Sequence, residues 1–88
     1  MPNKTEANKK ENSETGWKNI PGAQSLHRAI ALLRAVARHN DKGARLSHLS
    51  REVNLHIATA RRLLTVLTME GLTTYDPLSK HYRLGIGL

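Results

Sequence analysis

The 88-residue sequence contains no cysteine and no phenylalanine, and its aromatic side chains are one tryptophan and two tyrosines. Without cysteine, neither a disulfide framework nor a thiolate metal site is possible. No apolar run reaches the roughly 18 residues of a membrane-spanning helix, and the N-terminus is rich in Lys, Asn and Glu where a signal peptide needs an apolar segment. We therefore expect a soluble, cytoplasmic protein without membrane contact.

Acidic residues are also scarce, because 7 Asp and Glu stand against 14 Lys and Arg and the formal net charge is +7. This excess favours a polyanionic partner, although it carries no information about the fold. The length allows one small domain, which buries only roughly 60% of the surface that its unfolded chain exposes. We expect its stability to be modest and sensitive to each core residue.

Residues 1–23 are predicted to be a disordered N-terminal tail, because they hold few large apolar side chains besides Trp17 and Ile20. Such a segment cannot bury enough surface to offset the entropy lost on ordering. The two exceptions are interpreted as docked loosely on the domain or on a neighbouring chain, with insertion into nucleic acid as the alternative. The folded domain is predicted over residues 24–88.

A first helix is predicted to begin at Ser25, a good cap that follows the helix breaker Pro21-Gly22. Leu32 and Ala35 are predicted to point away from the main apolar face of this helix. They are interpreted either as a contact with another subunit or as ordinary exposed side chains. The main face has helical spacing and consists of Leu26, Ala29, Ile30, Leu33 and Ala37, with Val36 beside it.

A short second helix is predicted over residues 47–53, with Ser47 as its cap. A third helix follows over His56–Glu70. Between them stands Asn54, and Asn tolerates the left-handed conformation of a sharp turn better than other non-glycine residues. Two short helices joined in this way form a helix-turn-helix, which indicates DNA binding. The core residues expected in the second helix and just before it are Leu46, Leu49 and Val53.

The third helix has two contrasting faces. Its apolar seam is predicted to consist of Ala60, Leu63, Leu64 and Leu67. Each buried leucine contributes roughly 1.5 to 3 kcal/mol, so the seam fixes the orientation of the helix. Short side chains on the opposite face allow close approach to a groove wall, and two arginines there can reach guanine edges or phosphate oxygens. The alternative is a solvated arginine pair on an ordinary surface helix. The outward residues are Ala58, Arg62, Thr65 and Met69, flanked by Thr59 and Arg61.

After Gly71 the apolar pattern becomes strand-like. Residues 72–75 and 82–84 are β-formers separated by a polar segment, which predicts a hairpin. The predicted fold is thus mainly α with a small β-hairpin, a winged helix-turn-helix with three helices plus a wing. A basic wing grips the phosphate backbone or the adjacent minor groove. Tyr75 and Tyr82 are interpreted as packing residues rather than base stackers. The basic residues of the wing are Lys80, His81 and Arg83.

The chain from Gln24 to Leu88 resembles the N-terminal DNA-binding domain of IclR-type bacterial transcriptional regulators. The resemblance rests on three segments in order, which are Ser25–Ala29, Leu55–Leu64, and Asp76-Pro77 with Tyr82–Gly85. It implies sequence-specific binding of double-stranded promoter or operator DNA, with the third helix in the major groove and the wing on the backbone.

Several residues depart from the family pattern Gly-Leu-Pro-Lys-Ser-Thr-Val-His-Arg-Leu-Leu, which aligns with residues 54–64. His56 replaces the proline, which weakens the start of the helix. Ile57 replaces lysine and removes a charge. Ala58 replaces serine and removes a hydrogen bond to phosphate. Arg61 replaces histidine and adds a permanent charge. In the wing, Lys80 replaces a common glycine, so we expect a different turn. These departures affect the target sequence more than the function.

The resemblance also implies partners beyond this chain. A C-terminal effector-binding domain is expected to follow a linker helix and to bind a small-molecule effector, and such regulators act as a homodimer or dimer of dimers, often as repressors. By itself, a single small module is expected to bind DNA weakly. The predicted DNA-binding residues are Arg28, Ser47, His56, Ile57, Ala58, Thr59, Arg61, Arg62, Thr65, Lys80, His81 and Arg83.

We expect no enzymatic activity, no cofactor and no metal. Two histidines at i and i+4 on a helix, or a supporting carboxylate, are needed for a histidine metal site, and no two of the five histidines have that spacing. Winged helices also serve as protein–protein interaction modules, which is the competing function. Such adaptors show apolar or acidic residues on the outer face of the third helix, whereas this chain has Arg61 and Arg62. The five histidines are His27, His39, His48, His56 and His81.

Overall fold

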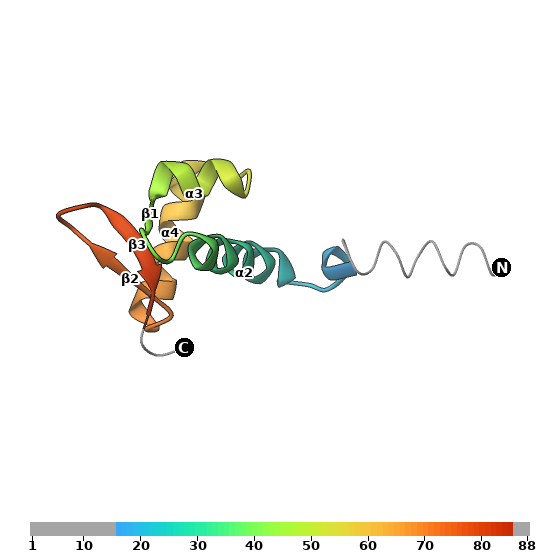
Figure 1. Cartoon of the computed structure of the whole chain (residues 1–88). Helices are drawn as coiled ribbons and strands as arrows, with labels where there is room; N and C mark the ends of the chain where they lie inside the picture. Colours follow the sequence, from blue (N-terminus) through green and yellow to red (C-terminus); the bar gives the residue numbers. More distant parts are fainter. Residues whose placement is uncertain (1–15, 86–88) are drawn as a thin grey trace.

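The computed structural model describes residues 16–85, which form a winged helix-turn-helix (Figure 1). The helices are η1 (Gly16–Asn19), α2 (Ala23–Arg38), α3 (Leu46–Glu52) and α4 (Ile57–Met69), and the strands are β1 (Ala44–Arg45), β2 (Thr73–Asp76) and β3 (His81–Leu84). The three α-helices and the β2–β3 hairpin confirm the predicted fold class. Among the described helices, none has the length and apolar character needed to cross a membrane.

The sheet has three antiparallel strands in the order β1-β3-β2. The hairpin was expected, but β1 was not, because a strand of 2 residues carries no periodic pattern. Ala44 pairs with Tyr82, and Arg45 pairs with His81. The central strand β3 therefore joins the wing to the segment that leads directly into α3.

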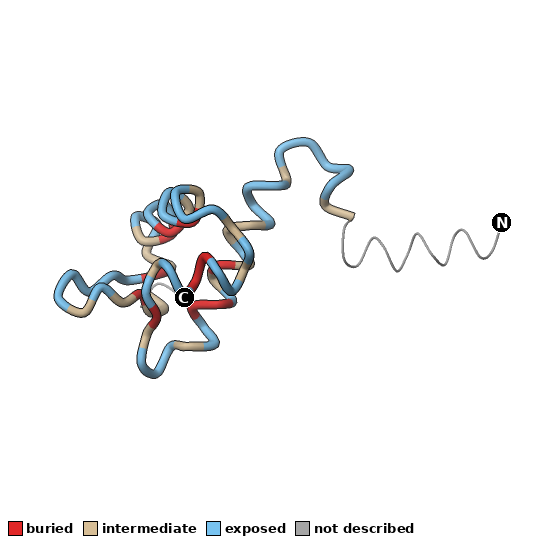
Figure 2. Tube along the Cα trace, turned by 90° about the horizontal axis from the view of Figure 1, so that it is seen from above, coloured by how far each residue is buried: buried red, intermediate tan, exposed pale blue. Residues whose placement is uncertain are grey.

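The core lies where α2, α3, α4 and the sheet meet. Figure 2 shows the buried segments gathered in the half of the molecule away from the N-terminus. In α4 the predicted seam is confirmed, because Leu64 is fully buried and Leu63 packs against the core from a partly buried position. The buried apolar residues are Leu32, Ala35, Val36, Ala44, Leu49, Ala60, Leu64, Leu67 and Tyr82.

The predicted apolar face of α2 is correct only in part, because Val36 is buried and Ala29 and Leu33 pack against the core, but the rest of the face is exposed. Leu32 and Ala35, which were expected to point away from it, are fully buried, whereas Leu26 is 63% exposed and Ile30 is 40% exposed. The buried face is rotated by roughly 100°, one residue of an α-helix, from the predicted one. Because apolar residues occupy nearly every position from Ala29 to Ala37, periodicity alone leaves two faces open, and packing against α4 and β3 selects between them.

The start of α2 also differs from the prediction. Gly22, with φ +77°, is the N-cap, and no side chain caps the helix, so Ser25 is not the cap. Within the tail predicted over residues 1–23, residues 1–15 lie outside the described part, and the remainder includes η1. The indole of Trp17 stacks on the His27 ring with centroids 4.1 Å apart, which is a docking of Trp17 on the domain.

The start of α3 differs from the prediction that Ser47 is its cap. Ser47 lies within the first turn, and the N-cap is the extended Arg45, with no side-chain hydrogen bond. The physical reason is that β1 runs straight into α3, so a strand residue occupies the cap position. Leu49 is buried as predicted, and Leu46 and Val53 pack against the core. Asn54 adopts φ +57°, which confirms the predicted left-handed turn between α3 and α4.

Gly43 supports the strand pairing through its lack of a side chain. Its φ is +78°, and a Cβ there would lie 2.9 Å from the Cβ of His81 and 3.1 Å from the carbonyl oxygen of Tyr82. Left-handed strain alone costs about 1–2 kcal/mol for other residues. We expect Gly43→Ala to lower the free energy of unfolding by this amount plus at least about 1 kcal/mol for the clash.

Urea denaturation measures this loss, and Gly22→Ala is the matched control. Gly22 has φ +77° but open space within 4 Å of its Cβ position, so its substitution introduces backbone strain without a clash. Equal losses in the two variants would contradict the close approach of Gly43 to β3.

Candidate nucleic-acid interface

A groove of about 560 Å³ lies between α4, the start of α3 and the wing, and we call it the α4–wing groove. Residues from all three elements line it, including Arg45, Ser47, Ile57, Arg61, Thr65 and Lys80. Three of these side chains are cationic. The fold thus gathers positive charge along one open surface, because β1, α4 and the tip of the wing converge there.

Five of the predicted DNA-binding residues line this groove, and the others lie elsewhere. The five are Ser47, Ile57, Arg61, Thr65 and Lys80. The start and exposed side of α4 hold His56, Ala58, Thr59 and Arg62, the sheet holds His81 and Arg83, and α2 holds Arg28. The predicted residues therefore form a main group around α4, with Arg28 on a separate helix.

His56 caps α4. It is the N-cap residue, with φ −60° and ψ 140°, and its Nδ1 accepts a hydrogen bond from the backbone N–H of Ala58 at 3.2 Å. This bond satisfies one of the free N–H groups at the start of the helix. The expectation that replacing proline weakens the start of the helix is therefore incomplete, because the imidazole supplies a cap that proline cannot.

Arg61 and Arg62 are both exposed on α4, with Arg62 nearly opposite the buried Ala60 and Leu64 and Arg61 on the flank. Within residues 16–85, neither guanidinium takes part in an ion pair. Arg61 lines the α4–wing groove, whereas Arg62 projects from the helix outside the groove lining. The two guanidinium groups are therefore available to a partner that approaches α4.

His81 and Arg83 fasten the wing to the loop after α2. The carbonyl oxygen of Lys42 accepts hydrogen bonds from Nδ1 of His81 at 2.9 Å and from Nη2 of Arg83 at 2.7 Å. Because a carbonyl only accepts, the Nδ1 of His81 carries the proton. These side chains have a structural role in the domain, and their contact with DNA stays a prediction.

The tip of the wing is a turn organised by Asp76. Its carboxylate accepts hydrogen bonds from the backbone N–H of Leu78 and the hydroxyl of Ser79, each at 3.0 Å, and the Leu78 bond is the main reason that the pKa of Asp76 is lowered. Lys80 follows with φ +62°. Glycine favours this left-handed conformation, so replacing glycine with lysine still leaves a left-handed residue at the tip and no different turn is required.

The two tyrosines of the hairpin have different environments. Tyr82 is 7% exposed and Tyr75 is 42% exposed, and their ring centroids are 4.7 Å apart. Burial raises the pKa of Tyr82. Tyr82 is thus a packing residue as predicted, whereas Tyr75 packs on it and also lines the α4–wing groove.

Sequence reasoning missed several residues of the groove. Arg45 lines it as a third cation, together with the side chains of Thr68 and Met69. Arg45 was missed because β1 was not expected, so no predicted element placed this residue beside α4 and the wing. The signal that could have indicated Arg45 is its position, since it is a basic residue directly before the first helix of the helix-turn-helix.

The family model of the IclR helix-turn-helix domain matches residues 25–77. The chain belongs to the IclR family. Residues 25–77, from α2 to the start of the wing turn, are the family's DNA-binding helix-turn-helix domain. This is a transcription-regulator family and not an enzyme class.

A solved structure supports the same assignment. The crystal structure of an IclR transcriptional regulator from Alicyclobacillus acidocaldarius is similar to this chain with a TM-score of 0.65 and 30% sequence identity. The similarity covers 69% of this chain and 24% of that regulator, so the IclR-type domain described here spans about a quarter of the length of that protein. A comparison with curated proteins finds no match.

Proposed function

We propose that this domain binds double-stranded DNA sequence-specifically, with α4 in the major groove and the wing against the phosphate backbone. The observation that carries the proposal is the exposed Arg61–Arg62 pair on α4, in which Arg62 lies nearly opposite the seam that fixes the helix on the core and Arg61 lies on the flank. The major groove is about 12 Å wide and admits an α-helix. An orientation fixed by the core presents the same side chains to every binding site.

The first turns of α4 suit close approach to base edges. Ala58 and Thr59 are short, so the helix can enter the groove before Arg61 and Arg62 extend toward the bases. An arginine that donates two hydrogen bonds to guanine contributes about 1–3 kcal/mol of discrimination against another base. Arg62, which is exposed on the outward face of α4, is assigned to base recognition.

The wing and the start of α3 are assigned to the phosphates. Lys80 and Arg45 lie on the other sides of the α4–wing groove, and Ser47 offers a hydroxyl at the start of α3. Contacts to phosphate oxygens fix the register and orientation of a protein on the duplex but do not read its sequence. Lys80, Arg45 and Ser47 therefore position α4, the helix that recognises the base sequence.

A protein partner for the same surface is the alternative, because Met69 is 78% exposed and Val66 is 53% exposed on α4. The charge of the groove favours DNA, however. Arg45, Arg61 and Lys80 line it, and none of the described residues that line it is acidic. A surface that concentrates cations in this way suits a polyanion.

We further propose that the full-length regulator acts as a homodimer or a dimer of dimers on promoter DNA. A dimeric helix-turn-helix protein places its two recognition helices in successive major grooves, so the operator is expected to be a pseudo-palindrome with half-sites about 34–36 Å or a multiple apart. A small-molecule effector, bound by a C-terminal domain, stays a prediction from the family resemblance.

The salt dependence of binding tests the contact with DNA. A duplex selected from a random pool is titrated with the protein, and fluorescence anisotropy gives the Kd at several salt concentrations. Each phosphate contact contributes about −0.9 to the slope of log K against log salt. Three or four cationic contacts therefore predict a slope of roughly −3 to −4. A slope near zero would contradict binding through the cations of the α4–wing groove.

A further inference from the structure

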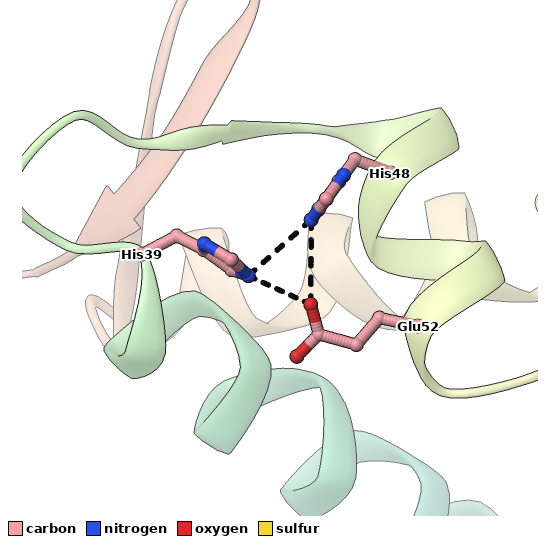
Figure 3. Close-up of side chains that lie close together, drawn as sticks. All are labelled: His39, His48 and Glu52. Atoms are coloured by element: carbon pink, nitrogen blue, oxygen red, sulfur yellow. Dashed lines mark hydrogen bonds and ion pairs between the residues drawn. The ribbon is translucent and has the colours of Figure 1, made fainter.

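Two histidines and a carboxylate meet between α2 and α3 (Figure 3). His39 follows the end of α2, and His48 and Glu52 lie four residues apart on α3. Nε2 of His39, Nε2 of His48 and Oε1 of Glu52 face one another. No metal site was expected because no two histidines lie at i and i+4, but His48 and Glu52 have that spacing on α3 and His39 approaches them from the end of α2.

The three atoms are spaced as ligands of one tetrahedral ion. Oε1 of Glu52 lies 2.7 Å from Nε2 of His39 and 3.3 Å from Nε2 of His48, and the two nitrogens are 3.3 Å apart. Ligand atoms that lie about 2.0–2.1 Å from a tetrahedral zinc ion are about 3.3 Å from one another. Two of the three separations match this value, and the third requires a small outward shift of one side chain.

Hydrogen bonds alone do not satisfy all three polar atoms of this cluster. A carboxylate only accepts, so each imidazole must carry its proton on Nε2 in order to donate to Glu52. The two N–H groups then face each other at 3.3 Å with no lone pair between them. A cation that replaces both protons would meet three lone pairs directed at one point.

The other oxygen of Glu52 is already held. Nε of Arg38 donates a hydrogen bond to Oε2 at 2.7 Å, and Nη2 of Arg38 forms an ion pair with the same oxygen at 2.5 Å, which leaves Oε1 directed at the histidines. A partner that orients a metal ligand from outside the ligand set is a common feature of metal sites.

The cluster remains open to solvent. The side chains of His39 and His48 are 36% and 49% exposed, so a metal ion can enter and a water molecule can complete its coordination. Three protein ligands with one open position are a common arrangement for zinc. The nearby charge of Arg38 opposes a cation, so we expect weaker binding than at a closed four-ligand site.

We propose that His39, His48 and Glu52 form a binding site for a zinc-type divalent transition metal ion that ties the end of α2 to α3. Imidazole nitrogens and a carboxylate oxygen are ligands for Zn²⁺, whereas Ca²⁺ and Mg²⁺ prefer oxygen ligands alone. Since α3 is the first helix of the helix-turn-helix, a bound ion stabilises the position of this motif on α2. None of the three ligands lines the α4–wing groove, although His39 and His48 line a neighbouring hollow together with Arg45 and Ser47.

Isothermal titration calorimetry of the full chain with zinc chloride, after treatment with a chelator, tests the proposal. We expect one zinc ion per chain, with affinity reduced at least about tenfold in His48→Gln and in Glu52→Gln. His27→Gln is the matched control, because His27 stacks on Trp17 away from the cluster, and it should bind zinc like the parent. Zinc should also raise the Tm of the parent and of the control more than that of His48→Gln.

Failure to bind zinc, or binding that is unchanged in both His48→Gln and Glu52→Gln, would overturn the site. If a variant does not fold, the NMR signals of the histidine rings in the unmodified chain, recorded with and without zinc, still test the proposal. Zinc should shift the ring signals of His39 and His48 and leave that of His27, which stacks on Trp17, in place. Shifts confined to other histidines would also overturn the proposal.

Discussion

Replacing Leu64 by alanine is expected to lower the free energy of unfolding by about 2–5 kcal/mol. Leu64 is fully buried in the middle of α4, where this helix packs against α2 and α3. The substitution removes apolar contacts and leaves a cavity that a small core cannot fill by relaxation. Because small domains are stable by only about 5–15 kcal/mol, this one change removes a large share of the total.

Urea denaturation followed by circular dichroism measures the loss. Val66→Ala, on the same helix but 53% exposed, is the matched control and should change the free energy of unfolding by about 0.5 kcal/mol or less. Comparable losses in the two variants would contradict the orientation of α4.

Removing both outward arginines of α4 is expected to produce the largest loss of DNA binding. In the double variant Arg61→Ala with Arg62→Ala, two contacts worth about 1–3 kcal/mol each are lost, so the Kd for a selected duplex should rise at least about 30-fold. The fold should be retained, because both side chains are exposed. Fluorescence anisotropy gives the Kd, and the urea midpoint reports whether the fold is intact.

A charge-matched variant separates specific contacts from net charge. Arg34→Ala with Lys18→Ala also removes two positive charges, but from α2 and η1, outside the α4–wing groove. We expect the Kd of this variant to rise only a few-fold, since distant surface charges act through screened, long-range attraction. If both double variants lost affinity equally, α4 would not be the contact surface.

The sequence predicted the parts of the fold that are set by short-range pattern. The spacing of Ala60, Leu64 and Leu67 defines the main apolar seam of α4, so the orientation of the helix followed directly. Asn54 was expected in the left-handed region because few other side chains tolerate it. The hairpin was predicted from two runs of β-formers around a turn. At the candidate site, the outward residues of α4 were predicted from the same helical spacing as its buried seam.

Other features depend on tertiary contacts that a linear pattern does not contain. The apolar residues of α2 are nearly continuous, so its buried face is selected by α4 and β3. Strand β1 exists because β3 offers a partner to Ala44, and it brings Arg45 into the groove and displaces Ser47 from the cap. The cluster of His39, His48 and Glu52 joins two helices. For such groups, sequence separation carries little information about distance in space.

The central claim is that α4 reads the base sequence while the wing holds the backbone. The most direct test is the ratio of the Kd for a scrambled duplex to the Kd for a selected duplex, measured for the parent, Arg62→Ala and Lys80→Ala. We predict that Arg62→Ala lowers this ratio about tenfold, since it loses a base contact, and that Lys80→Ala weakens both complexes equally and leaves the ratio unchanged. An Arg62→Ala protein with the full ratio, or a Lys80→Ala protein with a reduced one, would contradict the claim.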